Sequence, residues 1–355
     1  MPAGSQNDTK HLVELHFSRT NGAVDEVIDR LMKDVGGIAH PDIVREIILA
    51  GLKAGQENDG RMDLKLMNTS MKEMRFTAKV FGPYRDVRKV TVFGSARIQP
   101  DAPLYRMAVS LGKQLAAAGF MVITGGGPGI MQAANEGAGS EHSFGVNIRL
   151  PFEQKPNPVL VGNPRHITYK YFFNRKVAFL KEADAVVLFP GGFGTMDEAM
   201  ESITLLQTGK RYPLPLIMID EPGGTYWERL CRFLEKELSD QGYISPDDFG
   251  LIEKVDRPED AVDRIRRFYS RYHSLRYVKE KLVIRMTTWL DADQVNALKN
   301  AYADILVPGG EMRLSGPLDD EMDEPELIHL PRLVVDFKRK DFGRLRQLVD
   351  AINDC

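Results

Sequence analysis

Four residues at the start of a predicted helix have the chemistry of a phosphate-binding loop. Gly191, Gly192, Gly194 and Thr195 follow an apolar run at 185–189 that predicts a strand. Glycine permits a tight turn and the close approach of an anion, and the N-terminus of a helix offers free N–H groups to that anion. We therefore expect these four residues to bind a phosphate group.

Three carboxylates, Asp197, Glu198 and Glu201, come directly after this loop. Like charges repel, so a site that only binds phosphate would not favour acids here, and the pattern indicates a second, chemical task. Glu198 also has a structural interpretation, because Thr195 and Glu198 have the spacing of a capping box at a helix start. The structural interpretation of Glu201 is an ordinary exposed helix position. Both interpretations stay open from the sequence.

Arg175 lies in a predicted helix, at about 171–182, that is apolar on nearly all sides. Phe172 and Phe179 lie three residues before it and four residues after it, on the same side of the helix. A cation in such surroundings needs an anion, which is either a bound ligand or a carboxylate of the protein in a buried ion pair. The next residue, Lys176, has the ordinary interpretation of a surface lysine.

An alternation of strands and helices must position these residues. Short apolar runs with helical patterns between them predict strands at 90–93, 120–124, 144–150, 185–189 and 214–220. This order predicts an α/β fold with a doubly wound parallel sheet of the Rossmann-like type. Ligands of such sheets bind beyond the carboxyl ends of the strands, so we expect the site there.

Three loops at that edge of the sheet are candidates for the site, at 94–97, 125–129 and 191–195. A dinucleotide-binding fold carries G-x-G-x-x-G after its first strand, but here that strand ends in Gly-Ser-Ala-Arg, which disfavours NAD or FAD. The lysine of an ATP-binding P-loop is missing from all three loops. The predicted pocket is completed by Ser95, Gly125, Gly126, Gly127, Lys176 and Glu201.

We predict three parts in the chain: 1–88, 89–272 and 273–355. The first is a helical region, with amphipathic patterns at 24–32, 43–52 and 64–80. The second is the α/β core. The last is a small α+β domain, with strand patterns at 282–286, 330–337 and, more weakly, 311–314, and helical patterns at 292–306 and 344–352.

Two charged segments stand out in the last part. An acidic loop at 319–326 is expected to be solvated rather than functional. A basic cluster is expected to form a solvated helix face, with binding of an anionic effector as the alternative. Its members are Lys338, Arg339, Lys340, Arg344 and Arg346.

Composition excludes several classes of protein. With 355 residues, 43% of them hydrophobic, the chain can bury a large core, and its net charge of −3 gives no general attraction to nucleic acid or to an anionic membrane. The two cysteines, Cys231 and Cys355, cannot form a disulfide framework or a metal cluster, and we expect no metal. The first ten residues lack the apolar core of a signal peptide. We expect a soluble protein of the reducing cytoplasm.

Three motifs together resemble the LOG family, named after the plant "lonely guy" phosphoribohydrolases. They are Pro-Gly-Gly-Phe-Gly-Thr-Met-Asp-Glu at 190–198, Phe-Asn-Arg-Lys at 173–176 and Gly-Gly-Gly-Pro-Gly-Ile-Met at 125–131. The resemblance covers about residues 85–270. Two further stretches, 145–158 and 206–210, resemble the longer bacterial branch of nucleotide nucleosidases rather than the short plant type.

The resemblance implies an enzyme that cleaves the N-glycosidic bond of nucleoside 5′-monophosphates, releasing a base and ribose 5-phosphate. It places Arg175 and Glu198 at the family's two catalytic positions, and Gly191, Gly192, Gly194 and Thr195 at its phosphate loop. This agrees with the residues themselves, because a carboxylate beside the sugar stabilises the positive charge that develops on ribose during cleavage. AMP is the first substrate to test, and a nucleotide carrier or sensor without catalysis is the alternative.

The resemblance also bears on cofactors and partners. Family members were long labelled lysine decarboxylases, but that activity needs a lysine that binds pyridoxal phosphate, and nothing in the sequence identifies one. We therefore expect no cofactor. A homodimer or larger homo-oligomer is implied, because the active site of this family lies near a dimer interface.

Overall fold

Two compact units make up the chain, Met1–Lys72 and Glu73–Cys355, and each is described by itself. The computed structural model describes residues 17, 21–151, 155–321 and 323–355. The first ten residues, for which the absence of a signal peptide is predicted, lie outside the described residues, as does part of the stretch 145–158. The division at 88 and 272 stays a prediction.

The first unit contains helices α2 (Ala23–Val35) and α3 (Pro41–Glu57) and the beginning of α4 (Arg61–Phe81). These three helices confirm the amphipathic patterns of the N-terminal region. A buried ion pair between Asp25 and Arg45 joins α2 to α3. Across the described ranges, no helix is long and apolar enough to cross a bilayer.

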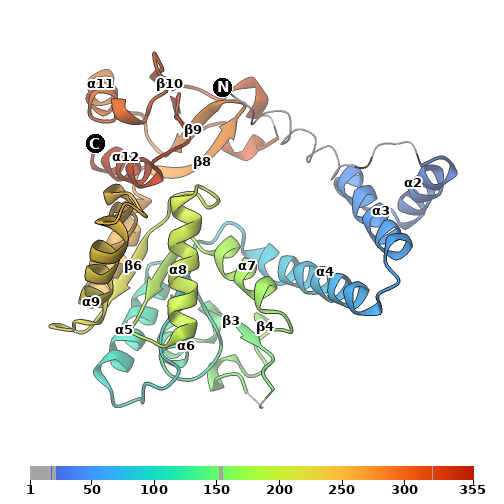
Figure 1. Ribbon diagram of the computed structural model, residues 1–355, viewed down its shortest axis with the longest axis horizontal. Helices are drawn as coiled ribbons and strands as arrows, with labels where there is room; N and C mark the ends of the chain where they lie inside the picture. Colours follow the sequence, from blue (N-terminus) through green and yellow to red (C-terminus); the bar gives the residue numbers. More distant parts are fainter. Residues whose placement is uncertain (1–16, 18–20, 152–154, 322) are drawn as a thin grey trace. The chain divides into compact units, whose positions relative to one another are not determined.

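A sheet of seven parallel strands is the centre of the second unit and confirms the predicted doubly wound α/β fold (Figure 1). Its strands are β1 (Lys89–Phe93), β2 (Met121–Thr124), β3 (Ser143–Ile148), β4 (His166–Tyr169), β5 (Ala185–Leu188), β6 (Leu216–Ile219) and β7 (Glu253–Val255). They lie in the order β4-β3-β2-β1-β5-β6-β7. The sequence pattern missed β4 and β7, which are the two edge strands and contain exposed polar residues in place of a continuous apolar run.

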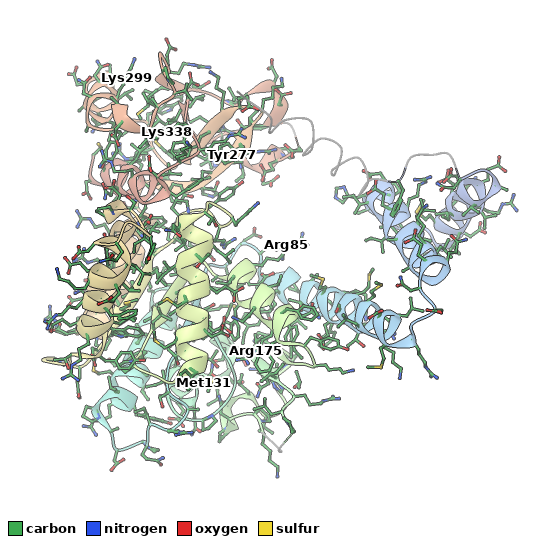
Figure 2. The ribbon with its side chains drawn as sticks, in the orientation of Figure 1. Arg85, Met131, Arg175, Tyr277, Lys299 and Lys338 are labelled. Atoms are coloured by element: carbon green, nitrogen blue, oxygen red, sulfur yellow. The ribbon has the colours of Figure 1, made fainter. Side chains whose placement is uncertain are left out.

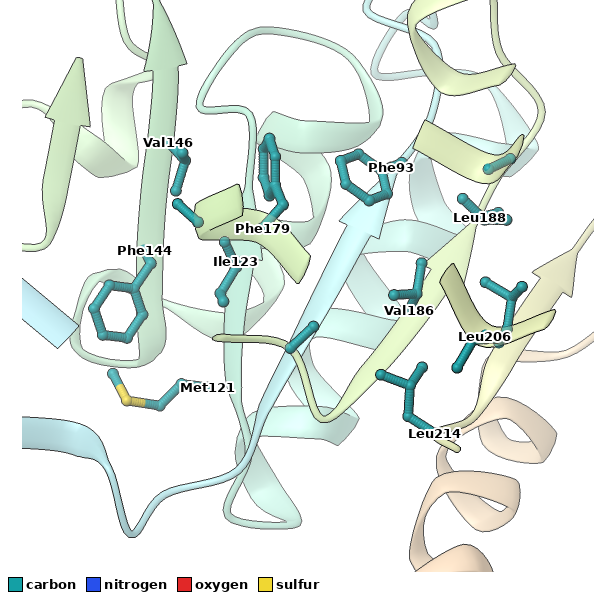
Figure 3. Packing of buried hydrophobic residues seen from close by; sticks show 14 of the residues in the cluster. Phe93, Met121, Ile123, Phe144, Val146, Phe179, Val186, Leu188, Leu206 and Leu214 are labelled. Carbon is teal, nitrogen blue, oxygen red and sulfur yellow. The ribbon is translucent and has the colours of Figure 1, made fainter. Parts of the chain in front are cut away.

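Helices cover both faces of this sheet. On one face lie α5 (Pro103–Ala117), α6 (Ile130–Ala138) and α10 (Pro258–Phe268). On the other lie α7 (Phe172–Glu182), α8 (Phe193–Gln207), α9 (Tyr226–Phe233), which continues as a π-helix at Leu234–Ser239, and the end of α4. Figure 3 shows the core under this second face, where the rings of Phe93 and Phe179 lie 4.8 Å apart.

The strand order reverses between β1 and β5, and this reversal positions the site. The chain leaves β1 toward β2 on one side and leaves β5 toward β6 on the other, so the loops that follow the two strands separate and leave a crevice. The loops remain joined at their base, because the Ser95 N–H donates to the Pro190 carbonyl over 3.1 Å. The predicted phosphate loop and the loop at 94–97 are therefore neighbours.

A second, antiparallel sheet forms the C-terminal part in the order β10-β11-β9-β8 and confirms the predicted α+β character of this region. Its elements are β8 (Tyr272–Val278), β9 (Lys281–Met286), α11 (Ala292–Ala301), β10 (Met312–Ser315), β11 (Arg332–Val335) and α12 (Phe342–Asp354). Strand β8 was not predicted, because polar residues interrupt its apolar positions. A separate core lies between this sheet and α11 and α12.

The acidic segment of this sheet is only in part the solvated loop that was predicted, because Glu321 is buried while Asp319, Asp320, Asp323 and Glu326 are exposed. Glu321 is 0% exposed and binds Arg285 over 2.6 Å and Arg332 over 3.2 Å. Burial by itself raises the pKa of Glu321, but hydrogen bonds from the Leu318 N–H and the two arginines outweigh it and lower the pKa. Two arginines on buried strands need a counter-charge, and the acidic segment supplies it.

The predicted basic helix face is also corrected. Arg346 is 2% exposed and donates to the Leu214 carbonyl over 2.9 Å and to Glu253 over 2.6 Å, at the beginning of β6 and β7. Arg344 is paired with Asp304. These arginines therefore form ion pairs within the protein and do not belong to one solvated helix face, as the sequence had suggested.

Replacing Glu321 with Gln tests the importance of this buried cluster. The variant leaves the buried Arg332 without its anion and Arg285 with Glu324 alone, so we expect a loss of about 3–5 kcal/mol in the free energy of unfolding. Denaturation in urea followed by circular dichroism measures it. Asp320→Asn is the matched control, because Asp320 pairs with Lys279 at the surface and should matter little. Equal effects of both variants would contradict the assignment.

Candidate active site

A cavity of about 920 Å³ lies at the crevice between β1 and β5. The loop after β1 and the segment 190–198 form most of its wall, and Met131, Phe172, Arg175 and Tyr226 complete it from other elements. The six residues predicted from the family motifs, Gly191, Gly192, Gly194, Thr195, Arg175 and Glu198, all line this cavity. The structure therefore brings the predicted phosphate loop, cation and carboxylate together in one place.

The glycine loop leaves the start of α8 open to the cavity. A side chain on Gly191 would come within 2.1 Å of the Thr195 hydroxyl, so only glycine fits this close contact. At Gly192 and Gly194, by contrast, an added Cβ would meet no atom within 4 Å. The N-terminus of the helix thus faces open space, as an anion-binding loop requires.

Glu198 is not part of a capping box. Helix α8 begins at Phe193 with Gly192 as its N-cap, so Thr195 lies inside the helix and makes no capping hydrogen bond. The Glu198 side chain is instead buried, with 5% of the residue exposed, and its Oε2 atom has no hydrogen-bond partner. Burial raises the pKa of Glu198 to about 7, although Lys176 and Arg175 lower it, while Glu201 and Asp197 raise it further. A buried oxygen without a partner at a cavity wall suits a bound ligand.

Arg175 lines the cavity from the first turns of α7. Of the two alternatives for Arg175, the internal ion pair is not formed: within the described part of the chain, no carboxylate lies at ion-pair distance from Arg175, and its Nε is buried without a partner. The guanidinium group lies 5.0 Å from the ring centre of Phe179 and 6.0 Å from that of Phe172. Burial lowers the pKa of Arg175 from its very high usual value.

Lys176, not Arg175, forms the ion pairs with Asp197 and Glu201 of α8. Its Nζ lies 2.8 Å from Asp197 Oδ2 and 2.5 Å from Glu201 Oε2. Burial lowers the pKa of Lys176, but these two hydrogen bonds outweigh it and raise the pKa overall. Lys176 and Glu201 do not line the cavity. They lie behind Glu198, and their assignment as pocket residues stays a prediction.

The triple glycine also lies behind the cavity wall. A side chain on Gly125 would come within 2.9 Å of Arg175 Nη2 and 2.7 Å of Met131 Sδ, so this glycine leaves room for both side chains, which are labelled in Figure 2. Gly126, which has a positive φ of 70°, donates its N–H to the Thr124 hydroxyl, and the carbonyl of Gly127 accepts from Asn157. These glycines support the wall, and their direct contact with substrate stays a prediction.

Ser95 forms hydrogen bonds that connect several loops of the site. Besides its bond to Pro190, its carbonyl accepts from the Ile130 N–H over 3.0 Å, and its hydroxyl accepts from the Arg97 N–H over 3.1 Å. It therefore ties the loop after β1 to the phosphate loop and to the start of α6. Unlike the triple glycine, Ser95 does line the cavity.

Several cavity residues were not predicted as site residues, among them Met131, Phe172 and Tyr226, while Arg97 lies in the candidate loop 94–97 but was given no role. Arg97 is exposed, and its guanidinium group has no ion pair among the described residues; its place directly after the first strand was a usable signal. Tyr226 gave no signal in the sequence, because it lies 35 residues from Gly191, whose carbonyl accepts a hydrogen bond from the Tyr226 hydroxyl over 2.7 Å.

Comparisons with known proteins give matches to a family model and to individual relatives. The family model described as "Possible lysine decarboxylase" matches residues 128–265. A "Probable cytokinin riboside 5′-monophosphate phosphoribohydrolase" of Oryza sativa subsp. japonica is 28% identical over 208 residues, which cover 56% of this chain and 78% of that protein. A cytokinin riboside 5′-monophosphate phosphoribohydrolase of Arabidopsis thaliana is 24% identical over 229 residues, which cover 63% of this chain and 94% of the Arabidopsis protein.

Among solved structures, the molybdenum cofactor carrier protein from Chlamydomonas reinhardtii is 18% identical, with a TM-score of 0.36, and the match covers 51% of this chain and 96% of that one. The family assignment depends instead on the sequence matches. The matched family model begins just before α6 and ends in α10, so it includes α7, the phosphate loop and α8. The family model and the relatives agree with one another, and both support a likeness of this chain to the LOG family.

Proposed function

We propose that this protein hydrolyses the N-glycosidic bond of nucleoside 5′-monophosphates, AMP being the first candidate, and releases a free base and ribose 5-phosphate. The observation that carries the proposal is the buried, unpartnered carboxylate of Glu198 in the same cavity as an open helix N-terminus. The relatives named above are phosphoribohydrolases of cytokinin riboside 5′-monophosphates, which are substrates of this chemical class.

The 5′-phosphate binds at the start of α8. The N–H groups around Gly192, Gly194 and Thr195 and the positive end of the helix dipole favour a dianion there. Arg97 supports this role from the facing loop, because its guanidinium group is exposed at the same cavity and is not neutralised by a carboxylate among the described residues. Anchoring the phosphate places the ribose one helical turn further along, beside Glu198.

Glu198 acts on the ribose. Breaking the bond between the base and C1′ builds positive charge on the sugar ring, which an adjacent carboxylate stabilises. The same carboxylate can accept a proton from the attacking water, and a pKa of about 7 is well matched to that exchange at neutral pH. Arg175, held between Phe172 and Phe179, offers its planar set of N–H donors to the substrate's hydroxyl or anionic groups.

The proposal extends to assembly and location. Four apolar side chains at the cavity mouth and on α7 are exposed: Phe172, Phe173, Val177 and Phe193, the last by 96%. An apolar surface of this kind is typical of a protein–protein interface, which supports a homodimer or larger homo-oligomer. We also propose that the protein is a cytoplasmic enzyme of the longer bacterial branch and that it needs no cofactor.

A panel of nucleoside 5′-monophosphates tests the activity directly. We expect release of free base from at least one of them, AMP first, and no release from the corresponding nucleosides, because these lack the phosphate that α8 anchors. Chromatography of the products measures the base. Saturable binding of the nucleotides without base release would instead identify a carrier or sensor.

Replacing Glu198 with Gln should reduce kcat by at least about 10²–10⁴-fold, because the amide cannot accept a proton or balance the positive charge on ribose. Affinity for ribose 5-phosphate should stay close to that of the wild type, since the phosphate site is unchanged. Steady-state kinetics and calorimetry measure the two quantities. Glu237→Gln, an exposed change on the π-helix after α9, is the control. Retained activity in Glu198→Gln would refute the role.

The pH dependence of kcat/KM follows from the raised pKa. Burial holds Glu198 protonated in acid, so the active anion appears only as the pH rises through about 7. We expect kcat/KM to increase with pH and level off above that value. A midpoint near the ordinary glutamate pKa of about 4.3 would show that another group controls the reaction.

A further inference from the structure

The three carboxylates at the start of α8 differ in their surroundings. Asp197 and Glu201 both contact Lys176, whereas Glu198, which lies between them, has a free Oε2 atom at the cavity. Of the three, Glu198 is the most deeply buried. Asp197 and Glu201 therefore share the single positive charge of Lys176, and Glu198 is the carboxylate with an oxygen available to a ligand.

Helix α7 presents two cations in succession to this acidic group. Arg175 faces the cavity, and Lys176, about 100° further around the helix, meets the two outer carboxylates instead. A lysine suits this position, because its compact ammonium group can satisfy two separate carboxylates, whereas the fork of an arginine favours one carboxylate bound at two points.

We propose that Lys176 is a positioning residue: by pairing with Asp197 and Glu201, it leaves Glu198 as the single carboxylate that is both free to face the substrate and able to ionise there. The inference rests on the hydrolysis proposed above. In this role Lys176 does not contact the substrate. Its pairing with two of the three acids also explains how these acids can follow a loop that binds phosphate.

The charges around Glu198 show why the pairing matters. Arg175 and Lys176 approach from α7, Asp197 and Glu201 flank it on α8, and across the cavity lie Arg97 and Tyr226. Without Lys176, two unpaired anions would oppose the ionisation of Glu198, and the dianionic phosphate of the substrate would add to them. The cation of Lys176 offsets this repulsion before the substrate arrives.

A set of charge variants tests the proposal through the pH profile of kcat/KM. Lys176→Met should raise the apparent pKa of the acidic limb by about 1 unit, so that activity below the midpoint falls about tenfold and the loss shrinks as the pH rises. Asp197→Asn and Glu201→Gln should shift the limb the opposite way, because each removes a negative charge and frees the charge of Lys176. Lys176→Arg should restore most of the wild-type profile.

Lys181→Met is the matched control. Lys181 lies on the same helix, is exposed and pairs with its neighbour Glu182, away from the cavity. This variant should leave the profile in place. If Lys176 served only to hold the two helices together, Lys176→Met would lower the whole profile without moving its midpoint, and the two acid variants would not shift it in the opposite direction. That result would overturn the proposal.

A direct titration separates this inference from the proposed activity. In protein labelled with ¹³C at the glutamate carboxyl carbon, the signal of Glu198 is the one that Glu198→Gln removes, and its midpoint can be followed by NMR without any substrate. A higher midpoint in Lys176→Met supports the role of Lys176 even if the wild type releases no base. An unchanged midpoint refutes it even if the wild type is an active hydrolase.

Discussion

The structure depends on the burial of one carboxylate without a partner. Leaving the Glu198 oxygen unpaired costs the desolvation free energy of a charged group, on the order of a few kcal/mol, and the surrounding fold must offset that cost. Helix α8 is fixed by packing, because Ala199 and Leu206 lie in the core of the α/β unit, and within the helix the Ser202 hydroxyl donates to the Glu198 carbonyl over 2.7 Å. Burial of this carboxyl group raises its pKa to about 7, so that its proton is exchanged near neutral pH.

The strand order explains why the predicted phosphate loop and the carboxylate can lie next to each other in one segment of the chain. Because the order reverses between β1 and β5, the loop after β5 has room in front of it, and the helix that follows begins directly at the cavity. The predicted phosphate loop and the carboxylate therefore occur within one short segment, 190–198, and their spacing is set by helix geometry. Only the cations come from elsewhere, Arg175 from α7 and Arg97 from the loop after β1.

This local arrangement also accounts for what the sequence could and could not predict. The loop and Glu198 were predictable because a few adjacent residues carry both, and the doubly wound fold followed from buried strands. The ion pairing was not predictable. The sequence left open whether Arg175 binds a ligand or a carboxylate, but in the structure Lys176 forms the ion pairs with the carboxylates. Neighbouring residues on a helix point in directions that differ by about 100°, and the sequence alone did not show which of the two faces the acids. The capping box failed because α8 begins two residues before Thr195. Edge strands β4 and β7 and the pairing of Glu321 depend on contacts far apart in the sequence, which periodicity does not record.

The C-terminal sheet contacts the opposite end of the core from the cavity. Arg346 of α12 reaches Leu214, just before β6, and Glu253, at the start of β7. The Tyr269 hydroxyl donates to the Asp184 carbonyl, just before β5, and Arg88, just before β1, donates to the His273 carbonyl. All four contacts lie at the amino ends of parallel strands, whereas the site lies at their carboxyl ends. This part of the chain therefore contacts the base of the sheet, at the end opposite to the cavity that contains Glu198.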